Sequence, residues 1–424
     1  MNTKLYFLTW LMLIFTLPAQ AQGLTYARYV IDTLCSPYMG GRGYVNEGHH
    51  RAALFIANEF KRWEADAFGE NYFQPFEVDV NVFPDAMEMQ VNKKTLRAGI
   101  DFLINPASAG IRGTYKVIRI KEKHLLNNKK FEQLLATSFD GKALWLNYRA
   151  KNAATLQGKL AVFKSAVKAA AYLLPEENKL TWHISGQPKY QTEITLFRKN
   201  IPRKIKTATL NIDNRFLRNY PTQNVIGYLP GTLYPDSFLV FTAHYDHLGR
   251  LGSKQYIPGA NDNASGVAML LNLMQHYAQT PHTCSVVFIA FGAEELGLLG
   301  SKYFTENPLF PLNKIGFLIN LDIVGTGDDG ATVVNATEFT NAWQTLVQLN
   351  DHHKLLPQLK SRTPAANSDH HWFYQNGVPC FFIYTMGGIK AYHDVYDRPQ
   401  TLPLTKFMEL HSLLTLFANA VQQP

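Results

Sequence analysis

Residues 238–246 read FLVFTAHYD, an uninterrupted apolar run followed directly by polar side chains. Three further apolar runs follow along the chain, at residues 286–291, 317–321 and 380–384. Segments with helical spacing of apolar residues alternate with these runs, at 265–279, 298–305, 340–353 and 403–420. Apolar strands that alternate with helices are typical of a parallel sheet covered on both faces. The sequence therefore predicts an α/β fold, with a mostly parallel mixed sheet flanked by helices.

The chain before residue 215 has a different pattern of apolar and charged residues. Residues 51–63 (RAALFIANEFKRW) have helical spacing, and residues 73–83 (FQPFEVDVNVF) alternate as a strand does. Residues 85–214 are richer in lysine and in short β-like runs. Because most connections inside a compact domain are short, a segment of this length must fold on its own. We predict an inserted, smaller β-rich domain at 85–214, between two parts of the α/β domain at 22–84 and 215–424.

Composition and charge exclude several classes of protein. Of the 424 residues, 46% are hydrophobic and 17% are charged, which is typical of a globular chain and not of a disordered one. The net charge is +8, but the basic residues are scattered. A nucleic-acid site would need a basic face with stacking aromatics, so we expect no nucleic-acid partner. The three cysteines (Cys35, Cys284 and Cys380) form no CxxC pair, so we do not expect cysteine to bind a metal.

The first 21 residues have the pattern of a signal peptide. Lys4 precedes an apolar run at 5–17 that is too short to span a bilayer, and Ala19-Gln20-Ala21 is a small-x-small cleavage site. We therefore predict a mature chain that begins at Gln22 and is exported, to the periplasm or the medium. No later stretch has 18 uninterrupted apolar residues, so we expect no stable membrane insertion after cleavage. The sequence leaves the oligomeric state open.

Candidate functional residues follow each of the apolar runs of the predicted sheet. They are His244 and Asp246 after the first run, Glu294 and Glu295 after the second, Asp322 after the third, and Tyr392 and His393 after the fourth. In open α/β sheets, sites are built at the C-terminal ends of the strands. Four such placements in one chain indicate that this edge of the sheet is a functional site.

The residue types at this edge fit a divalent metal. Zn²⁺ accepts imidazole nitrogen and carboxylate oxygen, and two ions about 3.5–4 Å apart can share a bridging ligand. Residues two apart at a strand end point the same way, so we expect the Asp246 carboxylate to accept the second ring N–H of His244. Neighbours on a turning backbone point differently, so one carboxylate of the Glu294-Glu295 pair can bind metal while the other acts as a general base. Asp262, in GANDNASG at 259–266, is either a ligand or the N-cap of the next helix.

Several motifs, in this order along the chain, resemble those of the co-catalytic zinc exopeptidases. They are HYDH at 244, GANDNASG at 259, FGAEELGLLGS at 291, NLDIVG at 320 and YHDVYD at 392, with a looser match at LCSPYMGGRG from residue 34. This family includes bacterial aminopeptidases, glutamate carboxypeptidase, glutaminyl cyclases and the transferrin receptor ectodomain. Many of its members carry an inserted protease-associated domain where residues 85–214 lie.

The resemblance implies a role for each matching residue. His244 and Asp322 would hold one zinc ion, and Glu295 and His393 the other. Asp262 would bridge both ions, with a cis peptide bond to Asn263. Glu294 would be the general base that takes a proton from a bridging water, and Tyr392 would help to hold the oxyanion. The resemblance thus implies an aminopeptidase with two zinc ions that acts on peptides with a free N-terminus.

Three other functions stay open at this point. A glutaminyl cyclase would use one zinc ion, at positions such as Asp262, Glu295 and His393. A non-catalytic binding ectodomain would be expected to have lost ligands, and this sequence has all of them. A carboxypeptidase for acidic dipeptides would be expected to place arginine in the substrate pocket, and the sequence alone does not assign Arg362 or Arg398 there.

Overall fold

The computed structural model describes residues 21–421, of which residues 21–34 form the first helix. The predicted signal peptide lies, apart from Ala21, outside the described residues. Within them, no helix is both long enough and apolar enough to cross a membrane.

The larger sheet has eight strands and is mixed, as the sequence predicts. Its order is β1 (Phe73–Val82), β10 (Arg215–Leu229), β14 (Cys284–Phe291), β11 (Tyr234–His244), β15 (Ile315–Leu321), β18 (Cys380–Thr385), β16 (Ala331–Val334) and β17 (Leu359–Arg362). The central strands β14, β11, β15 and β18 run parallel to one another. Their C-terminal ends therefore lie along one edge of the sheet, and the candidate residues follow these ends.

Helices cover both faces of this sheet. One face carries α2 (Gly48–Arg62), α6 (Ser265–Gln279), α8 (Thr340–His353) and α10 (Phe407–Val421), and the other carries α7 (Leu299–Glu306) and α9 (His370–Gln375). The alternating direction of the side chains along β11 explains how one strand packs against the helices on both faces. Phe241 packs in the apolar cluster of the first face and Val240 in that of the second, because successive side chains of a strand point to opposite faces. All eight residues of β14 are buried, as a central strand requires.

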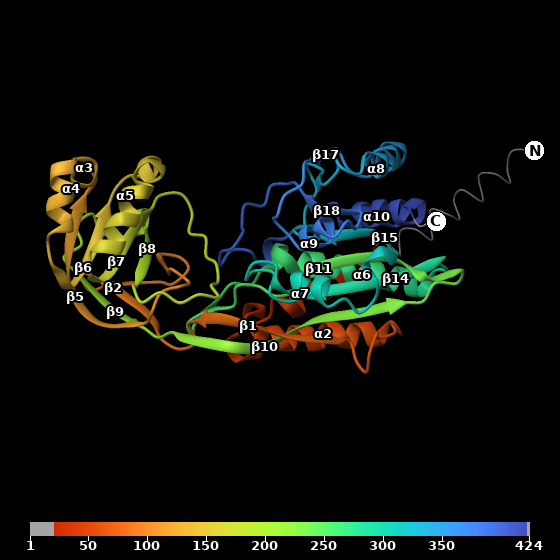
Figure 1. The fold of residues 1–424 in the computed structure, drawn as a ribbon, viewed down its shortest axis with the longest axis horizontal. Helices are drawn as coiled ribbons and strands as arrows, with labels where there is room; N and C mark the ends of the chain where they lie inside the picture. The colour runs from red at the N-terminus through yellow and green to blue at the C-terminus, as the bar shows by residue number, and fades with distance from the viewer. Residues whose placement is uncertain (1–20, 422–424) are drawn as a thin grey trace, which may run out of the picture.

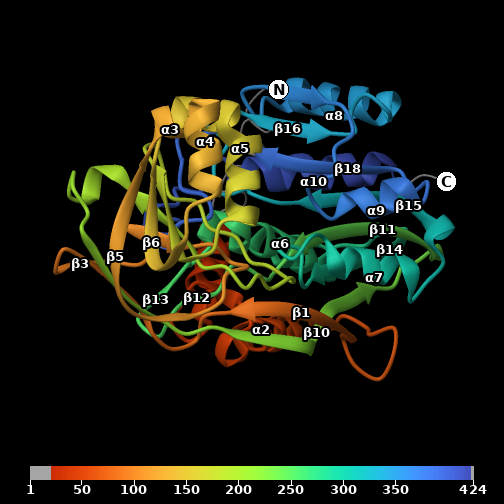
Figure 2. The same cartoon turned by 60° about the vertical axis from the view of Figure 1, so that its left-hand side comes forward.

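The residues that follow β1 and precede β10 in the chain form a second eight-stranded sheet (Figure 1). Its order is β3 (Lys94–Leu96), β2 (Met87–Val91), β9 (Thr207–Ile212), β5 (Ile111–Lys121), β6 (Phe139–Asn147), β7 (Ala169–Glu176), β8 (Glu193–Phe197) and β4 (Phe102–Ile104). Figure 2 shows α3 (Glu122–Leu126), α4 (Asn128–Leu135) and α5 (Ala153–Ala166) grouped at this sheet, where they share an apolar cluster with β6 and β7. The chain enters and leaves this region through the antiparallel pair β1–β10.

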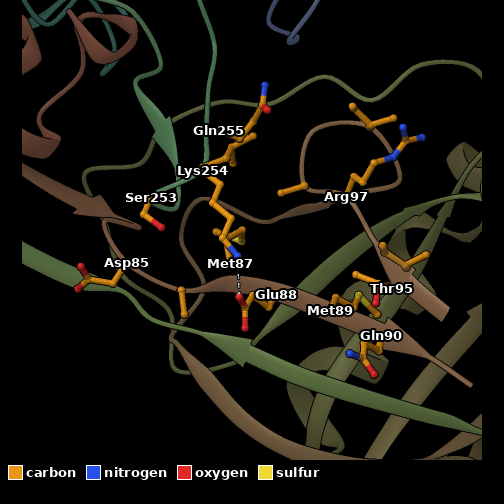
Figure 3. Close-up of a pocket in the computed structure, with 15 residues that line it drawn as sticks. Asp85, Met87, Glu88, Met89, Gln90, Thr95, Arg97, Ser253, Lys254 and Gln255 are labelled. Atoms are coloured by element: carbon orange, nitrogen blue, oxygen red, sulfur yellow. Dashed lines mark hydrogen bonds and ion pairs between the residues drawn. The ribbon is translucent and has the colours of Figure 1, made fainter. Parts of the chain in front are cut away.

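The two sheets are also joined by direct packing. Leu248 and Leu251, which follow β11, and Val395, which follows β18, lie in the same apolar cluster as Met89 and Leu96 of the second sheet. A cavity of about 460 Å³ lies at this joint, between β2 and the hairpin of β12 (Arg250–Leu251) and β13 (Gln255–Tyr256) (Figure 3). The ammonium group of Lys254 lies 3.1 Å from a carboxylate oxygen of Glu88 across it. Shared apolar packing of this kind limits the relative motion that separate domains otherwise have.

The expected elements agree with the structure except at their ends and at the sheet margins. The closing helix starts at Phe407 and not at 403, because Leu404 has a φ of 57° that interrupts helical backbone. The edge strands β16 and β17 were not expected from the sequence. They are four residues long, too short for a clear apolar pattern.

Candidate metal centre

The structure brings the predicted ligands together at one edge of the sheet. His244 is the last residue of β11, Asp322 follows β15 directly, and Glu295 and His393 lie on the loops after β14 and β18. Asp262 lies in the turn that precedes α6. His244, Asp262, Asp322 and His393 are at most 6% exposed.

The first group of ligand atoms surrounds Nε2 of His244. This atom lies 3.4 Å from Oδ1 of Asp262 and 3.4 Å from Oδ1 of Asp322. The other oxygen of Asp322, Oδ2, accepts a hydrogen bond of 2.9 Å from Ser368. Oδ1 of Asp322 is buried and has no hydrogen-bond partner within the described part of the chain. One buried carboxylate oxygen is therefore left facing His244 without a hydrogen-bond partner in the described residues.

The second group surrounds Nε2 of His393. This atom lies 2.9 Å from Oδ2 of Asp262 and 3.2 Å from Oε2 of Glu295. Oε1 of Glu295 lies 2.7 Å from Nδ1 of His247, so that oxygen is already engaged. Asp262 thus directs one carboxylate oxygen toward each group, which is the geometry of a bridging ligand.

These distances and charges fit a pair of zinc ions. In a tetrahedral zinc site with bonds of about 2.0–2.1 Å, neighbouring ligand atoms lie about 3.3–3.4 Å apart. The distances from His244 have this value, and those from His393 are slightly shorter. None of the described lysine or arginine side chains forms an ion pair with the carboxylates of the two groups, although buried carboxylates require a compensating charge. The site therefore has the donors and the negative charge that two divalent cations would balance.

Backbone contacts hold the turn that carries Asp262. The Asp397 carboxylate accepts the N–H groups of Asn261 and Asp262, and the buried guanidinium of Arg42 donates to the carbonyls of Gly259 and Asp262. Gly259 has a φ of 62°, and a side chain there would collide with the Asp262 carbonyl. The peptide bond between Asp262 and Asn263 is cis, as the resemblance implies.

The expected hydrogen bond from His244 to the Asp246 carboxylate is not formed, although the two groups lie near each other. Nδ1 of His244 lies 3.8 Å from the Asp246 carboxylate, beyond hydrogen-bond distance, and 3.2 Å from the Asp246 carbonyl oxygen. The carboxylate instead accepts the backbone N–H of Glu294 at 3.0 Å and that of Glu295 at 3.3 Å. Asp246 therefore orients the loop after β14, and the carbonyl takes the place of the carboxylate beside His244.

The two neighbouring glutamates have opposite electrostatic environments. Burial raises the pKa of Glu294 well above its usual value, and the Glu295 carboxylate adds to the rise although His244 opposes it. Burial also acts to raise the pKa of Glu295, but the His393 and His247 side chains outweigh it and lower this pKa to about 2. The lowered pKa favours the ionised form of Glu295, which a metal ligand would need, while the raised pKa of Glu294 is that of a group that could exchange a proton. Environments that separate the pKa values of two acids in this way are typical of catalytic sites.

A pocket of about 280 Å³ opens over the two groups. Its lining consists of His244, Asp262, Glu294, Glu295, Asp322, Ile323, Arg362, Asn367, Phe382, Tyr384, Tyr392 and His393. The ring of Tyr392 stacks on that of His393, with centroids 3.9 Å apart, and its side chain is partly exposed to solvent. Burial raises the pKa of its phenol, which therefore stays protonated and can donate a hydrogen bond.

Sequence reasoning missed three residues that support this site. They are His247, which contacts Glu295, and Arg42 and Asp397, which hold the turn of Asp262. Each lies within a motif that the resemblance includes: HYDH, GGRG and YHDVYD. The signal was therefore present, but a single histidine, arginine or aspartate in a motif does not say which distant group it contacts.

Comparisons with known proteins find similarity to peptidases in the part of the chain that carries the site. A buried double cluster of histidines and carboxylates places side chains that can bind a metal at the C-terminal edge of a parallel sheet, where open α/β sheets bind their ligands. Residues 224–418, somewhat less than half of the chain, match the sequence profile of peptidase family M28.

Individual relatives cover different shares of the chain. Aminopeptidase YwaD of Bacillus subtilis is 29% identical over 236 residues, which are 54% of this chain and 49% of that protein. A protein of Pyrenophora teres described as a probable zinc metalloprotease is 35% identical over 112 residues, 26% of this chain and 24% of that one. The matched segments thus span about half or less of these relatives. The crystal structure of BSAP, a zinc aminopeptidase from Bacillus subtilis, has the same fold, with a TM-score of 0.68 at 20% identity over 93% of this chain and 94% of that one.

Proposed function

We propose that this protein is a zinc-dependent aminopeptidase that binds two zinc ions and removes N-terminal residues from peptides. One observation carries the proposal: the Asp262 carboxylate directs Oδ1 to His244 and Oδ2 to His393, each beside a further carboxylate. His244 and Asp322 would hold one ion, Glu295 and His393 the other, and Asp262 both. The match of residues 224–418 to peptidase family M28 and the similarity to aminopeptidase YwaD support the activity.

The mechanism follows from the positions of the side chains. Bound zinc would supply Lewis acidity for the scissile carbonyl and lower the pKa of a water molecule toward ~7. Glu294 takes the proton of the attacking water and passes it to the leaving amine, because its carboxylate lines the pocket and has no hydrogen bond or ion pair within residues 21–421. Tyr392 lines the same pocket and donates its phenolic hydrogen to the developing oxyanion.

Metal content and activity on one sample test this proposal. We expect close to two zinc ions per purified chain, hydrolysis of a leucine anilide, loss of that hydrolysis after chelation, and its return when zinc is added. The measurements are elemental analysis and a colorimetric assay. One zinc ion per chain, with cyclisation of an N-terminal glutamine and no anilide hydrolysis, would identify a glutaminyl cyclase instead. A chain that binds no zinc would be a binding protein.

We also propose that the protein is exported and that residues 85–214 form a separate inserted domain. The N-terminal pattern, with Ala19-Gln20-Ala21 as the cleavage site, supports export. The second sheet, whose strands all lie between Met87 and Ile212, supports the boundaries of the insert. N-terminal sequencing of the protein recovered outside the cytoplasm should give Gln22 as the first residue.

A further inference from the structure

We propose that residues 179–183 of the insert position His393, so that the second sheet is needed for full zinc affinity at the His393 group. These residues lie between β7 and β8, more than 200 positions before His393 in the chain. The inference rests on the proposed zinc site and assigns the insert a role in it.

Lys179 fastens the loop that carries His393. Its ammonium group lies 2.8 Å from Oδ2 of Asp394, and it donates to the carbonyl oxygens of Lys390 and Tyr392, each at 2.8 Å. Asp394 is 6% exposed, so the loss of this cation would leave a buried carboxylate without its charged partner. Three contacts from one side chain thus hold both sides of His393.

Trp182 and His183 contact His393 directly. The backbone N–H of Trp182 donates to the His393 carbonyl at 2.9 Å, and the Trp182 carbonyl lies 3.1 Å from Nδ1 of His393. Nδ1 of His183 lies 3.2 Å from the same ring nitrogen. His393 has a φ of 52°, a left-handed conformation that such a residue keeps only where its surroundings hold it.

The consequence concerns the other ring nitrogen. Because the Trp182 carbonyl can only accept a hydrogen bond, its contact with Nδ1 of His393 keeps the ring proton there, and Nε2 keeps its lone pair toward Asp262 and Glu295. Contacts of this kind orient a metal ligand, and their loss typically costs about 10–100-fold in metal affinity. Lys179 and His183 are therefore positioning residues for the site, although they lie on a loop between two strands of the other sheet.

The test measures zinc affinity in the full-length chain, by competition with a chromogenic chelator. We expect Lys179→Met and His183→Ala each to lower the affinity for one of the two zinc ions about tenfold or more and to leave the affinity for the other ion unchanged. Lys179→Arg, which keeps a cation beside Asp394, should restore most of the affinity. Lys168→Met, at an exposed position of the insert, is the matched control and should bind zinc as the wild type does.

Each outcome decides the inference. Wild-type affinity for both ions in Lys179→Met and His183→Ala would overturn it, as would a wild-type chain that binds no zinc. If circular dichroism shows that Lys179→Met does not fold, His183→Ala decides alone. Because the readout is zinc binding, a chain that binds two ions and cleaves no peptide would contradict the proposed function and leave this inference standing.

A separate observation concerns the substrate, and it also rests on the proposed function. Among the described residues that line the pocket, Arg362 is the only lysine or arginine. Its guanidinium donates to the Tyr384 hydroxyl at 3.4 Å and forms no ion pair with a described carboxylate. Two zinc ions would balance the four carboxylates of the pocket, which leaves the positive charge of Arg362 uncompensated. We infer that the pocket favours substrates that bring a carboxylate to Arg362.

Two pairs of substrates distinguish the sources of that carboxylate. Glutamyl anilide against leucyl anilide tests a side-chain carboxylate, and leucyl-leucine against its C-terminal amide tests a terminal one. In one of the two pairs we expect kcat/KM to be about tenfold higher for the substrate that carries the carboxylate. The preference should disappear in Arg362→Ala and persist in Lys360→Ala, which removes a cation outside the pocket on the same strand.

The outcomes separate this inference from the proposed function. If Arg362→Ala leaves both ratios unchanged while the wild type cleaves leucyl anilide, the substrate inference is overturned and the aminopeptidase stands. If the wild type cleaves none of the four substrates, both fail.

Discussion

Glu294→Gln is expected to lower kcat at least about a hundredfold while the chain still binds two zinc ions. Removal of a general base typically costs about 10²–10⁴ in rate. The substitution keeps the size of the side chain, and the backbone N–H of Glu294 still donates to Asp246, so the loop after β14 should keep its conformation. Stopped assays with leucyl anilide and elemental analysis of the same sample measure the two quantities.

Two further variants serve as comparisons for this result. Glu306→Gln, at an exposed position of α7, should retain wild-type activity and zinc content. Glu295→Gln should instead lose zinc, because the Glu295 carboxylate lies beside Nε2 of His393, in the second group of ligand atoms. Turnover close to that of the wild type in Glu294→Gln would contradict its assignment as the base. Loss of zinc in Glu294→Gln would make it a ligand, which its closeness to His244 and Asp322 allows geometrically.

Asp262→Ala is expected to have the largest effect on zinc binding, because it removes a ligand from both groups at once. Structural sites with four ligands bind zinc with a free energy of about 10–16 kcal/mol. One ligand therefore contributes about 3 kcal/mol, which corresponds to about a hundredfold in affinity for each ion. The turn itself should survive, since Arg42 and Asp397 contact its backbone and not the Asp262 side chain. Zinc content after dialysis should fall from about two to less than one per chain.

Thermal unfolding gives an independent measure of the same substitution. Ligands that bind only the folded state stabilise it, so zinc should raise the melting temperature of the wild type and should raise that of Asp262→Ala far less. Asp236→Ala, at an exposed position of β11, is the matched control. If Asp262→Ala keeps two zinc ions through dialysis, Asp262 does not bridge them.

The sequence was informative where the controlling interactions are local. Apolar runs such as 286–291 mark central strands because every side chain there is buried, and the polar residue that follows marks the strand end. The parallel order of the central strands then places His244, Asp322 and their counterparts at one edge. The prediction of the ligand positions needed only this pattern and the motifs.

The prediction for Asp246 shows where such reasoning stops. Side-chain direction at a strand end suggested a contact with His244, but the carboxylate turns to two backbone N–H groups on the neighbouring loop. Those donors lie 48 positions away in sequence. A pattern of residues does not record which of several acceptors within reach a given donor will use.

The sequence by itself thus determined the α/β class, the strand ends and the types of residue that gather there. Only the tertiary structure decided which carboxylate oxygen faces which histidine, that Arg42 and Asp397 hold the turn of Asp262, and that Trp182 contacts His393. The physical reason is the range of the interactions. Burial and backbone periodicity act over a few neighbouring residues, whereas the orientation of a ligand depends on side chains brought from hundreds of positions away when both sheets pack together.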